Sequence, residues 1–194
     1  MKIAITGHTN GIGKSIFDEL ASNSKDSPNM HDVIGFSLST GYNISIPEDR
    51  ARIIEESSDC SVFINNAFDY SKWPTEENTD SQCLMAEEIF ASWEGQEKFI
   101  INIGSRINDF RTFEPEYKSI YAKQKKRLDD FYLEHSHAKP YIITVRPGST
   151  DTRVLQNETV EKLQPADIAK VIRFILENKN NFLIRTITMG KIND

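Results

Sequence analysis

Tyr121 and Lys125 are the two residues whose types and spacing best suit chemistry. Residues four positions apart lie on one face of a helix, so a lysine ammonium can sit near a phenol one turn earlier. A free tyrosine has a pKa of about 10, too high for an efficient base at neutral pH, and a nearby positive charge lowers it. The pair therefore suits proton transfer to or from an oxygen. Taken alone, the same pair is also typical of an ordinary amphipathic helix.

A glycine-rich turn near the N-terminus suits a phosphate. Residues 2–6 form a short apolar run that predicts a buried strand, and residues 13–21 have apolar side chains at helical spacing. Between them, Gly7, Gly11 and Gly13 permit positive φ angles and the close approach of a ligand. The free amides and the positive dipole end of the following helix favour an anion. The spacing Gly-x-x-x-Gly-x-Gly differs from the common dinucleotide pattern, and a plain strand-to-helix turn is the alternative.

A second interpretation of this turn is a triphosphate-binding loop. Residues 13–15 are Gly-Lys-Ser, the end of the pattern Gly-x-x-x-x-Gly-Lys-Ser. That pattern needs a glycine where this chain has His8. Phosphotransfer also needs a magnesium-binding aspartate at the end of a later strand, whereas the apolar run 60–64 is followed by Asn65 and Asn66. Both mismatches disfavour a phosphotransferase.

The elements that must position these residues alternate along the chain. The 194 residues are enough for one sizeable core, so we expect a single domain spanning 1–194. Strands are predicted at 2–6, 32–38, 42–44, 61–65, 98–104, 141–146 and 182–189. Helices are predicted at 13–23, 47–56, 75–93, 115–135 and 165–177. The alternation predicts an α/β fold of Rossmann type, doubly wound, with a mostly parallel seven-stranded sheet and helices on both faces.

Composition excludes several classes of partner. The chain has 29 acidic and 23 basic residues and a net charge of −6, which disfavours nucleic acid and anionic membranes. No apolar stretch is long enough to span a bilayer, and the N-terminus enters a strand directly, so we expect a cytoplasmic protein. Cys60 and Cys83 have neither disulfide nor metal-ligand spacing, so we expect two buried, reduced thiols and no metal site.

Polar motifs follow the predicted strands, where open parallel sheets bind their ligands. In chain order they are Thr6-Gly-x-x-x-Gly-Ile-Gly13, Asn65-Asn-Ala67, Asn102-Ile-Gly-Ser105, Tyr121-x-x-x-Lys125 and Arg146-Pro-Gly148. Each motif is weak alone, but together and in this order they resemble the short-chain dehydrogenase/reductase family. The resemblance covers essentially the whole chain, from Lys2 to the last strand.

The resemblance implies an NAD(P)-dependent oxidoreductase that acts on a small carbonyl or alcohol. Tyr121 would be the general acid or base, and Ser105 would donate a hydrogen bond to the same substrate oxygen. Lys125 would also hold the nicotinamide ribose hydroxyls, and the cofactor itself would carry the hydride. The implied cofactor-binding residues are Gly7, Thr9, Asn10, Gly11, Ile12, Gly13, Ser37, Ser39, Asn43, Ile44, Asn66, Ala67, Tyr121, Lys125, Pro147, Gly148, Thr150 and Thr152.

The end of the second predicted strand bears on the choice of cofactor. An acidic side chain there would bind the adenosine ribose hydroxyls and select NAD. The chain has none at that point, whereas Ser37, Ser39 and Thr40 could donate to a 2′-phosphate, so we expect NADP rather than NAD. The arginine that usually assists is missing from this loop and from the glycine turn. By resemblance, the segment at Asn43 borders the adenine and Thr152 meets the nicotinamide carboxamide.

Some features depart from the family pattern. The separation of Ser105 from Tyr121 is a few positions longer than usual, and the asparagine that helps anchor a relay water has a candidate only in Asn78. The segment 151–163 is short for a substrate lid, which predicts an open or shallow pocket. These features support an alternative hypothesis, that the chain is a dinucleotide-binding sensor or interaction protein with little or no turnover. The identity of the substrate stays open.

A homodimer or homotetramer is the expected assembly, because family members usually pair the helices after the fourth and fifth strands. The predicted helix 75–93 carries apolar side chains compatible with such a contact or with ordinary core packing: Leu84, Met85, Ile89, Phe90 and Trp93.

Overall fold

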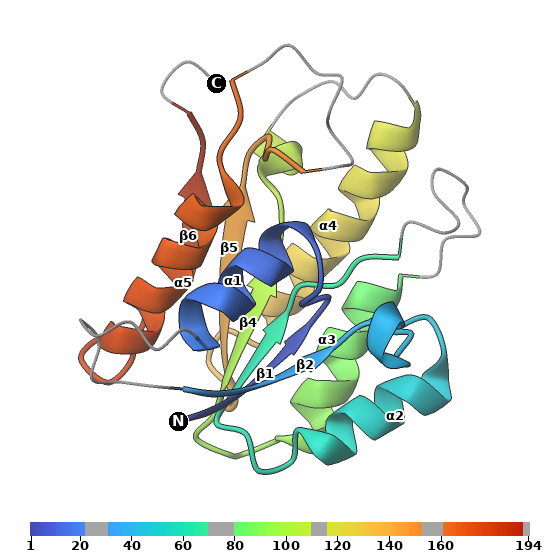
Figure 1. The fold of residues 1–194 in the computed structure, drawn as a ribbon, viewed down its shortest axis with the longest axis vertical. Coiled ribbons are helices and arrows are strands. Elements are labelled where there is room, and N and C mark those ends of the chain that lie inside the picture. Colours follow the sequence, from blue (N-terminus) through green and yellow to red (C-terminus); the bar gives the residue numbers. More distant parts are fainter. Residues whose placement is uncertain (22–30, 70–79, 110–115, 153–160, 192–194) are drawn as a thin grey trace.

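Strands and helices alternate along the chain in the computed structural model (Figure 1). The structure describes residues 1–21, 31–69, 80–109, 116–152 and 161–191. The strands are β1 (Lys2–Thr6), β2 (Asp32–Phe36), β3 (Val62–Asn65), β4 (Phe99–Ile103), β5 (Tyr141–Pro147) and β6 (Thr186–Met189). The helices are α1 (Gly11–Ala21), α2 (Pro47–Glu56), α3 (Ser81–Ser92), α4 (Glu116–Glu134) and α5 (Pro165–Asn178), with short 3₁₀ turns η1 (Leu38–Thr40) and η2 (Arg106–Asp109).

All the strands of the described chain are parallel and form one sheet in the order β2-β1-β3-β4-β5-β6. Strand order reverses between β1 and β3, which is the arrangement of a doubly wound fold. The predicted α/β Rossmann-type class is therefore confirmed. Within the described residues the sheet has six strands, so the predicted count of seven is wrong.

The missing strand is the one predicted at 42–44, and local hydrogen bonds explain its absence. The backbone amide of Ser37 is bonded to the hydroxyl of Thr40, and the amide of Tyr42 returns to the carbonyl of Ser37. Such side-chain to backbone bonds compete with a strand ladder. The chain therefore leaves β2 after Phe36, turns through η1, and enters α2 without pairing again.

Helices cover both faces of the sheet (Figure 1). On one face α1 and α5 pack over a core that includes Ile3 and Ile5 of β1. On the other face α2, α3 and α4 pack over a core that includes Ala4, Phe63 and Ile100. A sheet buried on both sides needs nearly continuous apolar strands, which is what the sequence of this chain provides.

The helix starts follow simple local rules. Pro47 and Pro165 open α2 and α5, at the first helical position where a missing N–H costs nothing. The predicted bounds 47–56 are those of α2. The described part of the predicted helix 75–93 contains α3, and residues 75–79 lie outside the described chain.

The apolar side chains predicted as a possible contact between subunits mostly belong to the core. Met85, Ile89, Phe90 and Trp93 are buried beneath α3, and Leu84 is half-buried. Core packing accounts for the four buried residues. The homodimer or homotetramer stays a prediction, as does the single domain 1–194.

Among the residues that the structure describes, no helix is both long enough and apolar enough to cross a bilayer.

Candidate functional site

Many of the predicted site residues lie at or just after the carboxyl ends of four neighbouring strands, and a separate group follows β2. Thr6 ends β1, Asn65 ends β3, Ile103 ends β4 two residues before Ser105, and Pro147 ends β5. Since parallel strands end at the same edge of a sheet, the loops that follow them gather there. The candidate site is this edge together with α1 and α4.

The glycine turn has the geometry that its sequence predicts. Gly7 and Gly11 have φ angles of 73° and 54°, a region that favours glycine. At Gly13 an added Cβ would lie 2.1 Å from the carbonyl oxygen of Gly7 and 2.4 Å from the side-chain nitrogen of Asn66. The turn therefore has no room for a side chain at Gly13, and it leads directly into the N-terminus of α1.

The end of β3 packs against the glycine turn. The hydroxyl of Thr6 accepts hydrogen bonds from the backbone amides of Asn66 and Ala67, both at 3.0 Å. The side-chain amide of Asn66 donates to the carbonyl of Thr6 at 3.0 Å. Thr152 also lies beside the glycine turn, since a Cβ added at Gly11 would lie 3.5 Å from the methyl group of Thr152. The structure thus brings three of the predicted cofactor-binding residues, Asn66, Ala67 and Thr152, against the glycine turn.

Lys14 does not take the place that a triphosphate-binding lysine would need. Its ammonium pairs with Asp18 one helical turn later at 2.5 Å, and both side chains are more than half exposed. Asn65, at the end of β3, is fully buried and donates to the carbonyl of Gln82. Both findings fit the sequence argument against a phosphotransferase.

Lys125 is buried at the end of β4, with its ammonium held by uncharged oxygens. Only 4% of the residue is exposed. Its Nζ donates to Oε1 of Gln82 at 2.6 Å and to the carbonyl of Ile103 at 3.1 Å. Because Ile103 precedes Ser105 by two residues, these bonds bring the middle of α4 to the predicted site of chemistry.

Two aromatic rings lie next to this ammonium. Its Nζ is 5.3 Å from the ring centroid of Tyr121 and 5.2 Å from that of Phe68. The two rings contact each other edge to face, with centroids 5.3 Å apart. Tyr121 and Lys125 therefore lie together as the helical spacing predicts, and Phe68, which follows the Asn-Asn-Ala motif, packs over both.

Burial controls the charge of Lys125. It lowers the pKa of the ammonium to about 8, and the weaker attractions of the Asp129 and Asp80 carboxylates act in the opposite direction. A lysine of this kind is still mostly charged at neutral pH. It loses its charge within the pH range in which many reductions and oxidations are assayed.

Ser105 lies in a segment fixed by ionic contacts. Its Oγ accepts a hydrogen bond from the amide of Ile107 at 3.1 Å, and its carbonyl accepts one from Nε of Arg146 at 3.3 Å. Arg146 also pairs with Asp109 at 2.5 Å and with Asp129 of α4 at 3.5 Å. These contacts anchor η2 between β5 and α4, so the long separation of Ser105 from Tyr121 begins with an ordered turn. Residues 110–115 lie outside the described chain.

The residues predicted near the adenosine form a separate group after β2. The hydroxyl of Ser37 lies 3.0 Å from that of Ser39 and 3.2 Å from that of Thr40. Ser37 is buried, whereas Ser39 and Thr40 are exposed. The side-chain oxygen of Asn43 accepts from the amide of Ser45, within its own loop. Ile44 is buried in the core under α2.

Arg52 of α2, which no motif singles out, approaches the same loop. Nη1 of Arg52 lies 3.5 Å from the carbonyl of Gly41, and its guanidinium carbon lies 4.6 Å from the ring centroid of Tyr42. The same group pairs with Asp49 at 3.0 Å. A guanidinium thus lies beside the loop after β2, and it comes from a later helix rather than from the loop itself.

The segment after β5 is anchored at both ends. The amide of Gly148 donates to the carbonyl of Met189 in β6, and the hydroxyl of Thr150 donates to the carbonyl of Gly148. Thr150 and Leu163 form a parallel bridge. This bridge closes the base of the predicted lid 151–163, of which residues 153–160 lie outside the described chain.

Of the remaining predicted residues, Thr9 and Asn10 bond to each other at 3.5 Å, and Ile12 packs against the core under α1.

The two cysteines and the candidate metal ligands complete the predicted features of the chain. Cys60 and Cys83 are free and buried, as expected. Burial raises the pKa of both thiols, that of Cys60 to about 11, so they stay protonated at neutral pH. In the described parts of the chain, no group of three or more His, Cys, Asp or Glu side chains could hold a metal ion. Asn78 lies outside these parts.

Comparison with known proteins identifies the fold. No protein-family model matches the sequence, and no curated protein matches it. Among solved structures, a 3-alpha-hydroxysteroid dehydrogenase from Pseudomonas sp. B-0831 complexed with NADH is similar with a TM-score of 0.76 at 16% identity, covering 98% of this chain and 95% of that one. An alcohol dehydrogenase from Thermococcus sibiricus complexed with 5-hydroxy-NADP gives a TM-score of 0.70 at 18% identity, covering 100% and 98%.

A third structure, a 3-ketoacyl-(acyl-carrier-protein) reductase from Brucella melitensis complexed with NADH, gives a TM-score of 0.71 at 16% identity and covers 97% of this chain and 96% of that one. A short-chain dehydrogenase/reductase from Serratia marcescens is similar as well. The chain therefore has a fold of the short-chain dehydrogenase/reductase type, as its motifs predict. At these identities the likeness concerns the fold.

Proposed function

We propose that this chain is an NAD(P)-dependent oxidoreductase of the short-chain dehydrogenase/reductase type. It transfers a hydride between the nicotinamide and a small carbonyl or alcohol, with Tyr121 as the general acid or base. The observation that carries the proposal is the burial of the Lys125 ammonium beside the Tyr121 ring, at the sheet edge that also bears the glycine turn. A buried charge is costly, and among the described residues no carboxylate forms an ion pair with this ammonium, which points to a functional role.

The chain's own residues would manage the proton. The positive charge of Lys125 favours the ionised phenol of Tyr121, so the tyrosine can give a proton to a substrate oxygen or take one from it. The hydroxyl of Ser105 already accepts a bond from the amide of Ile107, which leaves its own hydrogen to donate to the same oxygen. A bound nicotinamide would supply or accept the hydride.

The residues around the glycine turn fit a dinucleotide. Gly13 lets the turn pack closely against Gly7 and Asn66 where α1 begins. Free amides at a helix N-terminus favour a pyrophosphate. The absence of an acidic residue after β2, together with the exposed hydroxyl of Ser39, supports NADP over NAD. The hydroxyl of Thr40, also predicted as a donor, already donates to the carbonyl of Ser37. Arg52 adds a guanidinium next to Gly41 in the same loop, the kind of group that binds a 2′-phosphate.

The second candidate is a dinucleotide-binding sensor with little or no turnover. Phe68 favours it, because its ring covers both Tyr121 and Lys125. Substrate oxygen would have to reach the phenol past this ring.

Turnover of Tyr121→Phe separates the two candidates. The assay follows NADPH oxidation at 340 nm with a panel of small aldehydes and ketones. We expect the wild type to reduce at least one carbonyl, and Tyr121→Phe to lose about 100-fold or more in kcat while still binding NADPH. Lys126→Met, on the exposed face of α4, is the matched control and should keep full activity. Equal rates for wild type and Tyr121→Phe would contradict the proposed role of the tyrosine.

A further inference from the structure

The ammonium of Lys125 is held by a glutamine rather than by an acid. Nζ has three N–H donors, and two of them are taken by Oε1 of Gln82 and the carbonyl of Ile103. The bond to Gln82, at 2.6 Å, is the shorter of the two. Both acceptors are uncharged, so the positive charge is oriented without being neutralised.

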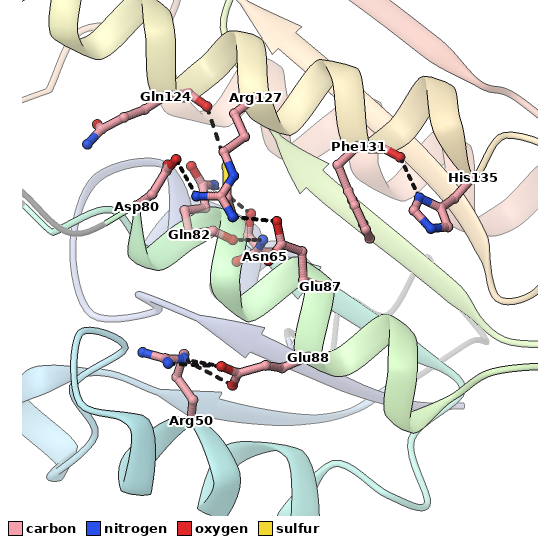
Figure 2. A network of polar contacts seen from close by, with 11 residues as sticks. Arg50, Asn65, Asp80, Gln82, Glu87, Glu88, Gln124, Arg127, Phe131 and His135 are labelled. Carbon is pink, nitrogen blue, oxygen red and sulfur yellow. Dashed lines mark hydrogen bonds and ion pairs between the residues drawn. The ribbon is translucent and has the colours of Figure 1, made fainter.

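Gln82 is itself locked in place. The residue is 4% exposed and lies at the start of α3. Its Nε2 donates to the backbone carbonyls of Asn65 and Ile103, both at 3.0 Å. The backbone carbonyl of Gln82 accepts a hydrogen bond from the side-chain amide of Asn65. With two carbonyls facing Nε2, the amide can present only its oxygen to Lys125. Figure 2 shows Gln82 beside Asn65, with α4 passing above.

We infer that Gln82 is a positioning residue, which sets the place and charge of the Lys125 ammonium for proton transfer at Tyr121. This inference rests on the proposed function. A carboxylate at this position would draw the ammonium into an ion pair and weaken its effect on the phenol. An apolar side chain would remove the acceptor and leave one N–H of a buried cation without a partner. A rigid amide holds the charge, and within the described chain the two bonds to Gln82 and Ile103 leave the third N–H for the site.

The surroundings of Lys125 make this assignment testable by pH. Its titratable neighbours are Tyr121 and Asp129 on its own helix, Cys83 on α3, and Asp80 just before α3. The contact from β4 is a backbone carbonyl, which does not titrate. The ring of Phe68 covers the ammonium from the loop after β3. Gln82 is thus the side chain whose replacement changes the charge next to Nζ without touching these groups.

The first experiment measures the pKa of Lys125 directly, by NMR of protein labelled with ¹³C and ¹⁵N in lysine. The signal is assigned by its loss in Lys125→Met. We expect Gln82→Glu, which has the same shape and a negative charge, to raise the pKa by about one unit or more, and Gln82→Met to lower it. Gln96→Met replaces an exposed glutamine of the same size and should change nothing. An unchanged pKa in Gln82→Glu would overturn the inference.

The second experiment measures kcat and KM against pH with NADPH and the carbonyl that the wild type reduces best. We expect Gln82→Met to lower kcat about 10- to 100-fold with little change in the KM for NADPH. Gln82→Glu should shift the pH profile in the direction of the NMR pKa, which a purely structural role would not do. Circular dichroism checks that both variants fold. If Gln82→Glu turns over with an unshifted profile, the inference fails and the proposed function stands. If the NMR shift is present but no carbonyl is reduced by the wild type, the proposed function fails instead.

Discussion

Replacing Lys125 by methionine should reveal the cost of burying its ammonium. Methionine has nearly the same length and no charge. The folded chain holds this amine at a pKa of about 8, against 10.5 for an ordinary lysine, because burial disfavours the charged form. Between these two values the unfolded chain binds the proton and the folded chain does not. The free energy of unfolding therefore rises with pH in this window, and the rise belongs to Lys125.

The size of the effect follows from the shift. A decrease from 10.5 to about 8, at about 1.4 kcal/mol per unit, corresponds to a penalty of about 3.5 kcal/mol that is fully present below pH 8 and absent above pH 10.5. Between pH 7 and pH 9.5 the wild type should recover about 2 kcal/mol relative to Lys125→Met. The bonds to Gln82 and Ile103 that the variant loses change its stability by an amount that does not depend on pH. Taking the difference between the two proteins also cancels the titration of groups elsewhere, such as Cys60.

Urea unfolding at half-unit steps from pH 7 to pH 9.5, with a reducing agent present, measures this difference. Lys126→Met is the control on the same helix, because the Lys126 ammonium is exposed and pairs with Asp130 at 2.6 Å. Its difference from the wild type should stay flat. For Lys125→Met, a difference in the free energy of unfolding that stays constant with pH, within about 0.5 kcal/mol, would show that burial does not destabilise the charged ammonium. That result would refute the account of its environment.

Three further substitutions test other parts of the site and its support. Gly13→Ala places a methyl group 2.1 Å from the carbonyl oxygen of Gly7, so unfolding assays should show a loss of about 1–3 kcal/mol and titration should show weaker NADPH binding. Arg52→Met should lower the affinity for NADPH about 3- to 10-fold while leaving NADH unchanged, and an equal effect on both would remove Arg52 from the phosphate site. Arg50 is 5% exposed, and its guanidinium pairs with the Glu88 carboxylate at 2.8 Å (Figure 2). Glu88→Gln removes that charge and should lower the free energy of unfolding, measured in urea, by about 1–3 kcal/mol. An unchanged free energy would mean that the guanidinium finds another partner.

Local sequence rules predicted most of the fold. The proline that opens α2 and the apolar spacing after it gave the bounds of that helix, and the glycine turn was predicted from residue types that permit positive φ and close packing. The ends of β3, β4 and β5 could be placed because apolar runs stop at polar motifs. The strand predicted at 42–44 was wrong, since hydroxyl groups of Ser37 and Thr40 bond to the backbone and turn the chain. Periodicity carries no information about such bonds.

The candidate site was predictable only in part. The helical spacing of Tyr121 and Lys125 placed the phenol and the ammonium together, because neighbours on a helix face are fixed by local geometry. The partner of that ammonium, Gln82, comes from another helix, and the guanidinium near Gly41 comes from Arg52. Contacts between distant segments depend on how helices pack on the sheet. No spacing within one segment reveals them.

A fluorescence titration with NADPH and with NADH tests the central claim most directly. Wild type, Tyr121→Phe and Gly13→Ala are compared, and the nicotinamide emission is followed as the protein concentration rises. The account predicts saturable binding to the wild type, tighter for NADPH, with binding retained in Tyr121→Phe and weakened in Gly13→Ala. If neither nucleotide binds the folded wild type, the glycine turn holds no dinucleotide and the proposed oxidoreductase is contradicted.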